Sequence, residues 1–182
     1  MAGIFNIWLV DKGTRSQYYW GEGTMYAVGT YLQEYFNQAC KKSKTFGSAN
    51  FSWSGSSGQV QPNEVVVYFL QNRSDSLVSA QGGTIKHGSG ATYTTGAGTI
   101  SEVYLTEMEG DRDYPRLVAN IAFHEILHNK LEPTPVADIH GIGGGGLSTP
   151  TVSRGMRPAD TEINHLATAL DRNVPQYTLK MS

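Results

Sequence analysis

One run of the sequence decides the fold and the chemistry: DYPRLVANIAFHEILHNKLE, at positions 113–132. Its apolar residues recur at the three- and four-residue spacing of a buried helical stripe, at Leu117, Val118, Ile121, Leu127 and Leu131. Asp111 and Asp113 precede the stripe, where carboxylates suit a helix N-terminus, and Pro115 is tolerated in a first helical turn. The pattern therefore predicts one helix over residues 113–132.

Two histidines of this predicted helix lie on one face. His124 and His128 are four residues apart, and side chains at that spacing stack above one another on a helix, so both rings can bind one metal ion. Glu125 lies about 100° further around the helix axis, where its carboxylate can reach a water on that metal without binding the metal itself. This is the HExxH arrangement, in which two imidazoles hold zinc and the glutamate takes a proton from the bound water. The competing interpretation is a helix whose histidines are solvated or hydrogen-bonded in a core.

A zinc site needs at least a third protein ligand, and the candidates lie downstream of the helix. We favour His140, because imidazole is a common zinc ligand and the surrounding prolines and glycines let its loop fold back over the helix. Asp138 could substitute for it, and Glu162, on the predicted last helix, would make a different kind of site. We interpret His165 as a helix-surface or core histidine and His87 as a solvated one.

Composition places the chain among folded proteins with long loops. It has 182 residues, enough for one domain, and its low fraction of charged residues (16%), with 21 glycines and 10 tyrosines, indicates a folded protein with long loops rather than a disordered one. The net charge of −2 argues against a nucleic acid or other polyanion as partner. A single cysteine, Cys40, excludes an intramolecular disulfide, and we expect it to be a small buried hydrophobe.

The sequence also carries no membrane signal. Its N-terminal run, residues 1–10, lacks the basic start and cleavage site of a signal peptide, and no apolar segment is long enough to span a bilayer. We therefore expect no membrane partner, and a cytoplasmic location or export without a classical signal.

The remaining patterns predict an α+β fold with a mixed sheet packed with two helices. Strands are expected at residues 4–11, 64–71 and 100–106, with short ones near 50–53 and 84–87. Helices are expected at 24–42, with Thr24 as its cap, and at 159–172.

Together these residues resemble a metzincin metallopeptidase. The resemblance rests on the HExxH run at 124–128, on His140 in a glycine-containing turn, and on Met156 with Pro158 just before the last helix, which looks like the methionine turn of that family. It covers most of the chain at the level of layout. The chain departs from the family signature in spacing, because His140 stands twelve residues after His128 rather than six, as if residues 132–137 were inserted.

The resemblance implies a single metallopeptidase domain over residues 1–182, with an upper lobe at 1–131, a smaller irregular lower lobe at 132–182, and the active-site helix at the floor of the cleft between them. It implies an endopeptidase whose Zn²⁺ is bound by His124, His128 and His140, with Glu125 as general base and Met156 as packing beneath the metal.

A peptide or protein substrate would lie extended along an edge strand, for which residues 82–87 are a candidate. Two alternatives stay open. One is a peptidase of the gluzincin type, with Glu162 as third ligand. The other is a catalytically silent, zinc-stabilised binding domain, and Glu125 argues against that because a purely structural site needs no base.

Overall fold

The computed structural model describes residues 1–56, 61, 63–77, 88–95, 98–131 and 138–172. Its strands are β1 (Gly3–Lys12), β2 (Phe46–Ser54), β3 (Glu64–Leu70), β4 (Gly90–Thr95) and β5 (Gly98–Tyr104). Its helices are α1 (Glu22–Cys40), α3 (Tyr114–Leu131) and α4 (Asp160–Asp171), with single helical turns η1 (Arg73–Asp75), η2 (Leu105–Met108) and η3 (Ile139–Gly141).

The predicted α+β class is confirmed, and the three helices fall within two residues of their predicted bounds. The short strand expected near 50–53 is longer, because β2 pairs with β1 along most of its length. Thr24 is not the cap of α1, since that helix begins at Glu22 and follows Gly21, which makes no side-chain cap. The strand expected at 84–87 and the edge expected at 82–87 lie outside the described residues.

The five strands form one mixed sheet in the order β2-β1-β3-β5-β4. The pairs β2–β1, β1–β3 and β3–β5 are parallel, whereas β4 runs antiparallel to β5. Sequence patterns did not predict β4, whose sequence GATYTT begins with Gly, has three Thr and lacks the apolar alternation of a half-buried strand. It is the last strand in the sheet order, next to the helix that carries the HExxH run.

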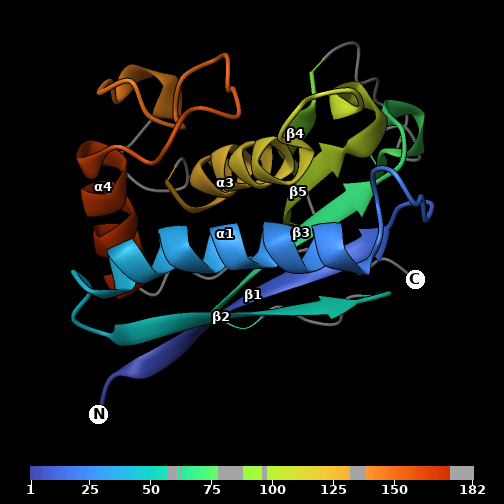
Figure 1. Ribbon diagram of the computed structural model, residues 1–182. Helices are drawn as coiled ribbons and strands as arrows, with labels where there is room; N and C mark the ends of the chain where they lie inside the picture. The colour runs from blue at the N-terminus through green and yellow to red at the C-terminus, as the bar shows by residue number, and fades with distance from the viewer. Residues whose placement is uncertain (57–60, 62, 78–87, 96–97, 132–137, 173–182) are drawn as a thin grey trace.

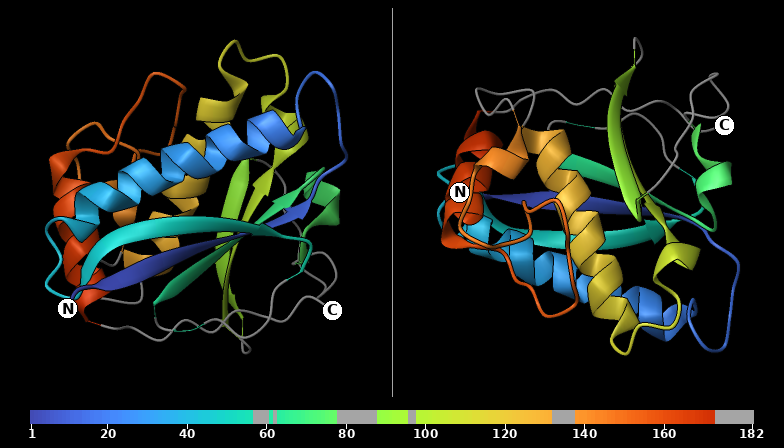
Figure 2. Two further views of the ribbon diagram at one scale, coloured as in Figure 1. Left: turned by 60° about the horizontal axis from the view of Figure 1, so that its bottom comes forward. Right: turned by 90° about the horizontal axis from the view of Figure 1, so that it is seen from above.

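Helices α1 and α3 lie together on one face of the sheet (Figures 1 and 2). Side chains alternate between the two faces of a strand, and every second residue of β1 (Phe5, Ile7 and Leu9) is buried against these helices. The helices contact each other through Phe123 of α3, which packs edge-on against Tyr35 and Phe36 of α1. The axis of α3 is therefore fixed from the sheet side and from the α1 side.

Residues beyond position 138 belong to the same core. Ile139, Leu147 and the apolar side of α4 join the buried cluster that contains β1, α1 and α3. Helix α4 packs against both α1 and α3. The segment that follows α3 thus returns to it, while the division into two lobes at residue 131 stays a prediction. None of the described helices has the length and apolarity needed to cross a membrane.

Lys130, in the last turn of α3, is an unusual member of this core. Its ammonium is buried, donates a hydrogen bond to the carbonyl oxygen of Glu64 (3.1 Å) and lies 5.2 Å from the ring centre of Phe5. Burial disfavours the charged form and lowers the pKa of Lys130 to about 7, from 10.5 in an exposed lysine.

This shift predicts a pH-dependent stability. Between pH 7 and 10.5 the unfolded chain holds the Lys130 proton more tightly than the folded chain, so the free energy of unfolding should rise with pH. Lys130→Met removes the charge at similar length and should remove this contribution, which is at most about 1.4 kcal/mol per pH unit. Urea unfolding of both metal-free proteins from pH 7 to 9.5 measures it. The prediction would be contradicted if the difference in free energy of unfolding between the wild type and Lys130→Met stayed constant from pH 7 to 9.5.

Candidate metal centre

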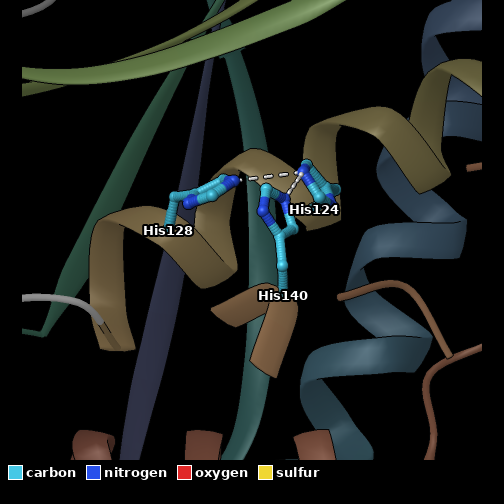
Figure 3. A group of neighbouring side chains, drawn as sticks. All are labelled: His124, His128 and His140. Carbon is cyan, nitrogen blue, oxygen red and sulfur yellow. Dashed lines mark hydrogen bonds between the residues drawn. The ribbon is translucent and has the colours of Figure 1, made fainter. Parts of the chain in front are cut away.

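Three histidines converge at the side of α3 that faces away from the sheet core. His124 and His128 come from α3 and His140 comes from η3, and their rings point toward one another (Figure 3). The Nε2 atom of His124 lies 3.1 Å from Nε2 of His128 and 3.4 Å from Nε2 of His140. One nitrogen from each ring lies within 4.8 Å of the other two, so this group could hold a metal ion. The structure therefore brings together the three ligands predicted from the sequence.

His124 is prepared for this role by its surroundings. Its Nδ1 lies 2.6 Å from the carbonyl oxygen of Leu147, which can only accept, so Nδ1 carries the proton and the lone pair lies on Nε2. The pKa of His124 is lowered to about 4, mainly by burial and in smaller part by the neighbouring His128 and His140. The ring is consequently neutral at pH 7 and can bind a cation.

Asp138 faces the outer side of the His140 ring. Its carboxylate Oδ1 accepts a hydrogen bond from the backbone N–H of His140 at the start of η3 and lies 3.3 Å from the ring Nδ1. A carboxylate in that position favours a proton on Nδ1 and a lone pair on Nε2. The structure thus gives Asp138 an orienting position beside His140, and the converging ligand atoms do not include it.

Glu162 lies elsewhere, buried at the first turn of α4. Its carboxylate accepts backbone N–H groups from Leu147 (2.9 Å), Ser148 and Ala159 (2.8 Å). It caps the helix and fixes the Leu147 peptide, whose carbonyl oxygen holds His124. Glu162 is therefore tied to the site through one peptide bond and is not part of the converging group. His165 is exposed on α4 and outside the group, and His87 lies outside the described residues.

Glu125 is buried between α3 and the edge strand β4. Thr92 donates its hydroxyl to the Glu125 carboxylate (2.7 Å) and also lies within hydrogen-bond distance of the Glu125 backbone oxygen (2.9 Å). Gly90 permits this approach, because a Cβ at that position would lie 2.8 Å from Cγ of Glu125 and 2.9 Å from the Glu102 carbonyl oxygen. Two residues of β4 thus position the carboxylate.

A cleft of about 480 Å³ contains these groups. The β4 side contributes residues 88–92, the opposite side contributes residues 150–152, and α3 supplies Ile121, the two histidines and Glu125. His140 also lines the cleft. The cleft therefore exposes the three imidazoles and the carboxylate to one shared volume beside the sheet edge.

Asn120 is a positioning residue that sequence reasoning missed. It is fully buried one helical turn before His124, accepts the hydroxyl of Tyr35 (2.7 Å), and donates to the carbonyl oxygens of Ser153 (2.9 Å) and Met156 (3.1 Å). It anchors the turn around Met156 to α3 and α1. The available signal was a polar residue at i−4 from His124 in an otherwise apolar stretch, which points to the same helix face.

The sequence matches no protein-family model and no curated protein.

Substitutions of His140 and Glu162 distinguish a residue that binds the metal from a residue that only orients a metal ligand. His140→Ala removes one converging nitrogen and should weaken metal affinity by more than the roughly 10–100-fold that loss of an outer partner costs. Glu162→Gln should keep one bound metal but lower the free energy of unfolding of the metal-free protein by about 1–3 kcal/mol, because a buried carboxylate that accepts three N–H groups is lost.

Metal titration and urea unfolding of both variants measure these effects, with His165→Ala as a control for an exposed histidine. Wild-type metal affinity in His140→Ala, or a greater loss in Glu162→Gln than in His140→Ala, would contradict the assignment.

Proposed function

We propose that this protein is a zinc-dependent endopeptidase of the metzincin type. One observation carries the proposal: three imidazole Nε2 atoms converge in a cleft that also holds the Glu125 carboxylate and is bordered by an edge strand. The residue types, the four-residue spacing of His124 and His128, and the position of Glu125 are those required for activating a water at a metal.

Zinc fits the nitrogen set. A tetrahedral zinc with Zn–N bonds of about 2.0–2.1 Å separates two ligand nitrogens by roughly 3.3 Å, and the His124 Nε2 atom lies 3.1 and 3.4 Å from its two neighbours. The contacts of Nδ1 in His124 and His140 direct both lone pairs into this space. Two ring nitrogens at such a separation are stabilised by a cation that binds both lone pairs or by a proton that one ring donates to the other, and imidazole is a preferred ligand of zinc.

The proposed chemistry divides between the ion and the chain. Zinc, if held by His124, His128 and His140, would lower the pKa of a coordinated water toward 7 and would polarise a peptide carbonyl. Glu125 accepts the proton of the attacking water and passes it to the nitrogen of the departing amine. Thr92 holds the carboxylate toward the cleft by its hydroxyl, which limits the orientations that Glu125 can adopt.

The position of β4 supports an extended peptide as substrate. Among the described residues β4 ends the sheet order, and residues 88–92, at and just before the start of β4, line the cleft, so a peptide can add to this edge by main-chain hydrogen bonds. Pairing over several residues places the scissile bond within a chain rather than at its end, which favours an endopeptidase. The opposite side, at residues 150–152, would contact substrate side chains.

The two alternatives fit the geometry less well. A gluzincin-type site needs Glu162 as ligand, and its carboxylate instead accepts three backbone N–H groups. A silent binding domain needs no acid next to the histidines, yet Glu125 lies in the same cleft. The turn at Met156, tied to α3 through Asn120, supports the metzincin type.

Glu125→Gln tests the proposal directly. Loss of the proton acceptor should lower kcat on a quenched fluorescent peptide library by at least about 100-fold, while one zinc per chain stays bound because Glu125 is not a ligand. Glu109→Gln, at an exposed position outside the cleft, is the matched control and should cleave at the wild-type rate. Equal cleavage by Glu125→Gln, or one bound zinc in the wild type with no cleavage of any library peptide, would overturn the proposal.

Gly90→Ala tests the placement of Glu125 from the strand side. The new methyl group would displace the Glu125 carboxylate or separate β4 from β5, and a misplacement of about 1 Å can lower the rate by roughly 100-fold. We expect a lower kcat with zinc still bound. The control is Gly23→Ala in the first turn of α1, where a Cβ meets nothing within 4 Å. Wild-type kinetics for Gly90→Ala would show that β4 does not set the position of the carboxylate.

A further inference from the structure

A second cavity, of about 520 Å³, lies between α1 and the segment that follows Met156. It shares no lining residue with the histidine cleft. Two arginines line it: Arg116 from α3 and Arg157 from the segment before α4. The proposed peptidase mechanism uses neither side chain, so the cavity needs an explanation of its own.

Arg116 is the more enclosed of the two. Its Nη2 donates to the carbonyl oxygen of Met156 (3.2 Å), and the guanidinium also interacts with the hydroxyl of Tyr35, but its Nε is shielded from solvent and has no hydrogen-bond partner among the described residues. Among the described residues no carboxylate forms an ion pair with this guanidinium. A shielded N–H donor on a charged group is costly to leave without an acceptor, and more so when no counter-charge is near.

The other lining groups add to this preference for negative charge. Arg157 is exposed at the cavity and has no ion pair among the described residues, and Pro158 follows it. Tyr31 and Gln38 of α1 offer a hydroxyl and an amide as neutral donors. Glu34 is the one acidic residue in the lining, and it is exposed and forms no ion pair with either arginine.

We propose that this cavity binds a small oxyanion, a carboxylate or a phosphate group, between Arg116 and Arg157. The planar guanidinium of Arg116 presents parallel donors that match two oxygens of such a group, and Arg157 adds a second positive charge at the opening. Because Arg116 also holds the Met156 carbonyl oxygen, the bound anion lies one side chain away from the turn that packs on α3. The site is independent of the proposed peptidase activity.

Titration of the full, zinc-loaded chain with inorganic phosphate and, separately, with acetate tests the proposal at constant ionic strength. We expect saturable binding that Arg157→Gln weakens by roughly tenfold or more. Arg116→Lys, which keeps the charge but loses the paired donors, should weaken it similarly. Arg112→Gln is the matched control, since Arg112 is another exposed arginine without an ion pair among the described residues and lies outside the cavity lining.

The two probes distinguish the kind of group recognised. Tighter binding of phosphate indicates a phosphate-bearing ligand, and tighter binding of acetate indicates a carboxylate. Binding of either anion to zinc would be equally strong in Arg157→Gln and the wild type. The proposal is overturned if Arg157→Gln and Arg112→Gln bind phosphate and acetate with the same affinity as the wild type, or if neither anion binds saturably at millimolar concentrations.

Discussion

The hydrogen bond from His124 Nδ1 to the carbonyl oxygen of Leu147 is the contact on which the site depends. It fixes the tautomer of a buried ring and so determines which nitrogen faces the cleft. Leu147 is itself held by Glu162, whose carboxylate accepts its backbone N–H and also caps α4. The first turn of the last helix thus controls the direction of an imidazole on α3, although the two residues are 38 positions apart in the sequence.

Different faces of helix α3 contact different parts of the structure. One stripe carries Arg116, Asn120, His124 and His128 at four-residue intervals, so the residues that hold the Met156 turn are continuous with the candidate ligands. Phe123 packs into α1, and Glu125 turns toward β4. Since each face contacts a different element, a shift of the helix would disturb the turn, the core and the carboxylate together.

Periodicity was enough to predict the α+β class and α3, because the buried stripe and the four-residue histidine spacing are local properties of the helix. His140 was predicted from the preference of zinc for imidazole. Its contact with His124 belongs to the tertiary structure and depends on how the chain from residue 138 packs back against α3. The position of Glu162 could not be read from sequence, since a carboxylate suits both a metal and a helix N-terminus. Sequence reasoning missed β4 because Gly90, which leaves room for Glu125, weakens a strand pattern and the threonines supply no apolar alternation.

The three imidazoles come from two elements, α3 and η3, and this couples metal binding to folding. An ion bound to His128 and His140 would join positions twelve residues apart and act as a cross-link between α3 and η3. The unfolded chain does not hold these nitrogens together, so binding of the ion requires the chain to be ordered, and part of the binding free energy becomes folding free energy. The affinity of the centre would then reflect how firmly η3 is held against α3 as well as the strength of three nitrogen ligands.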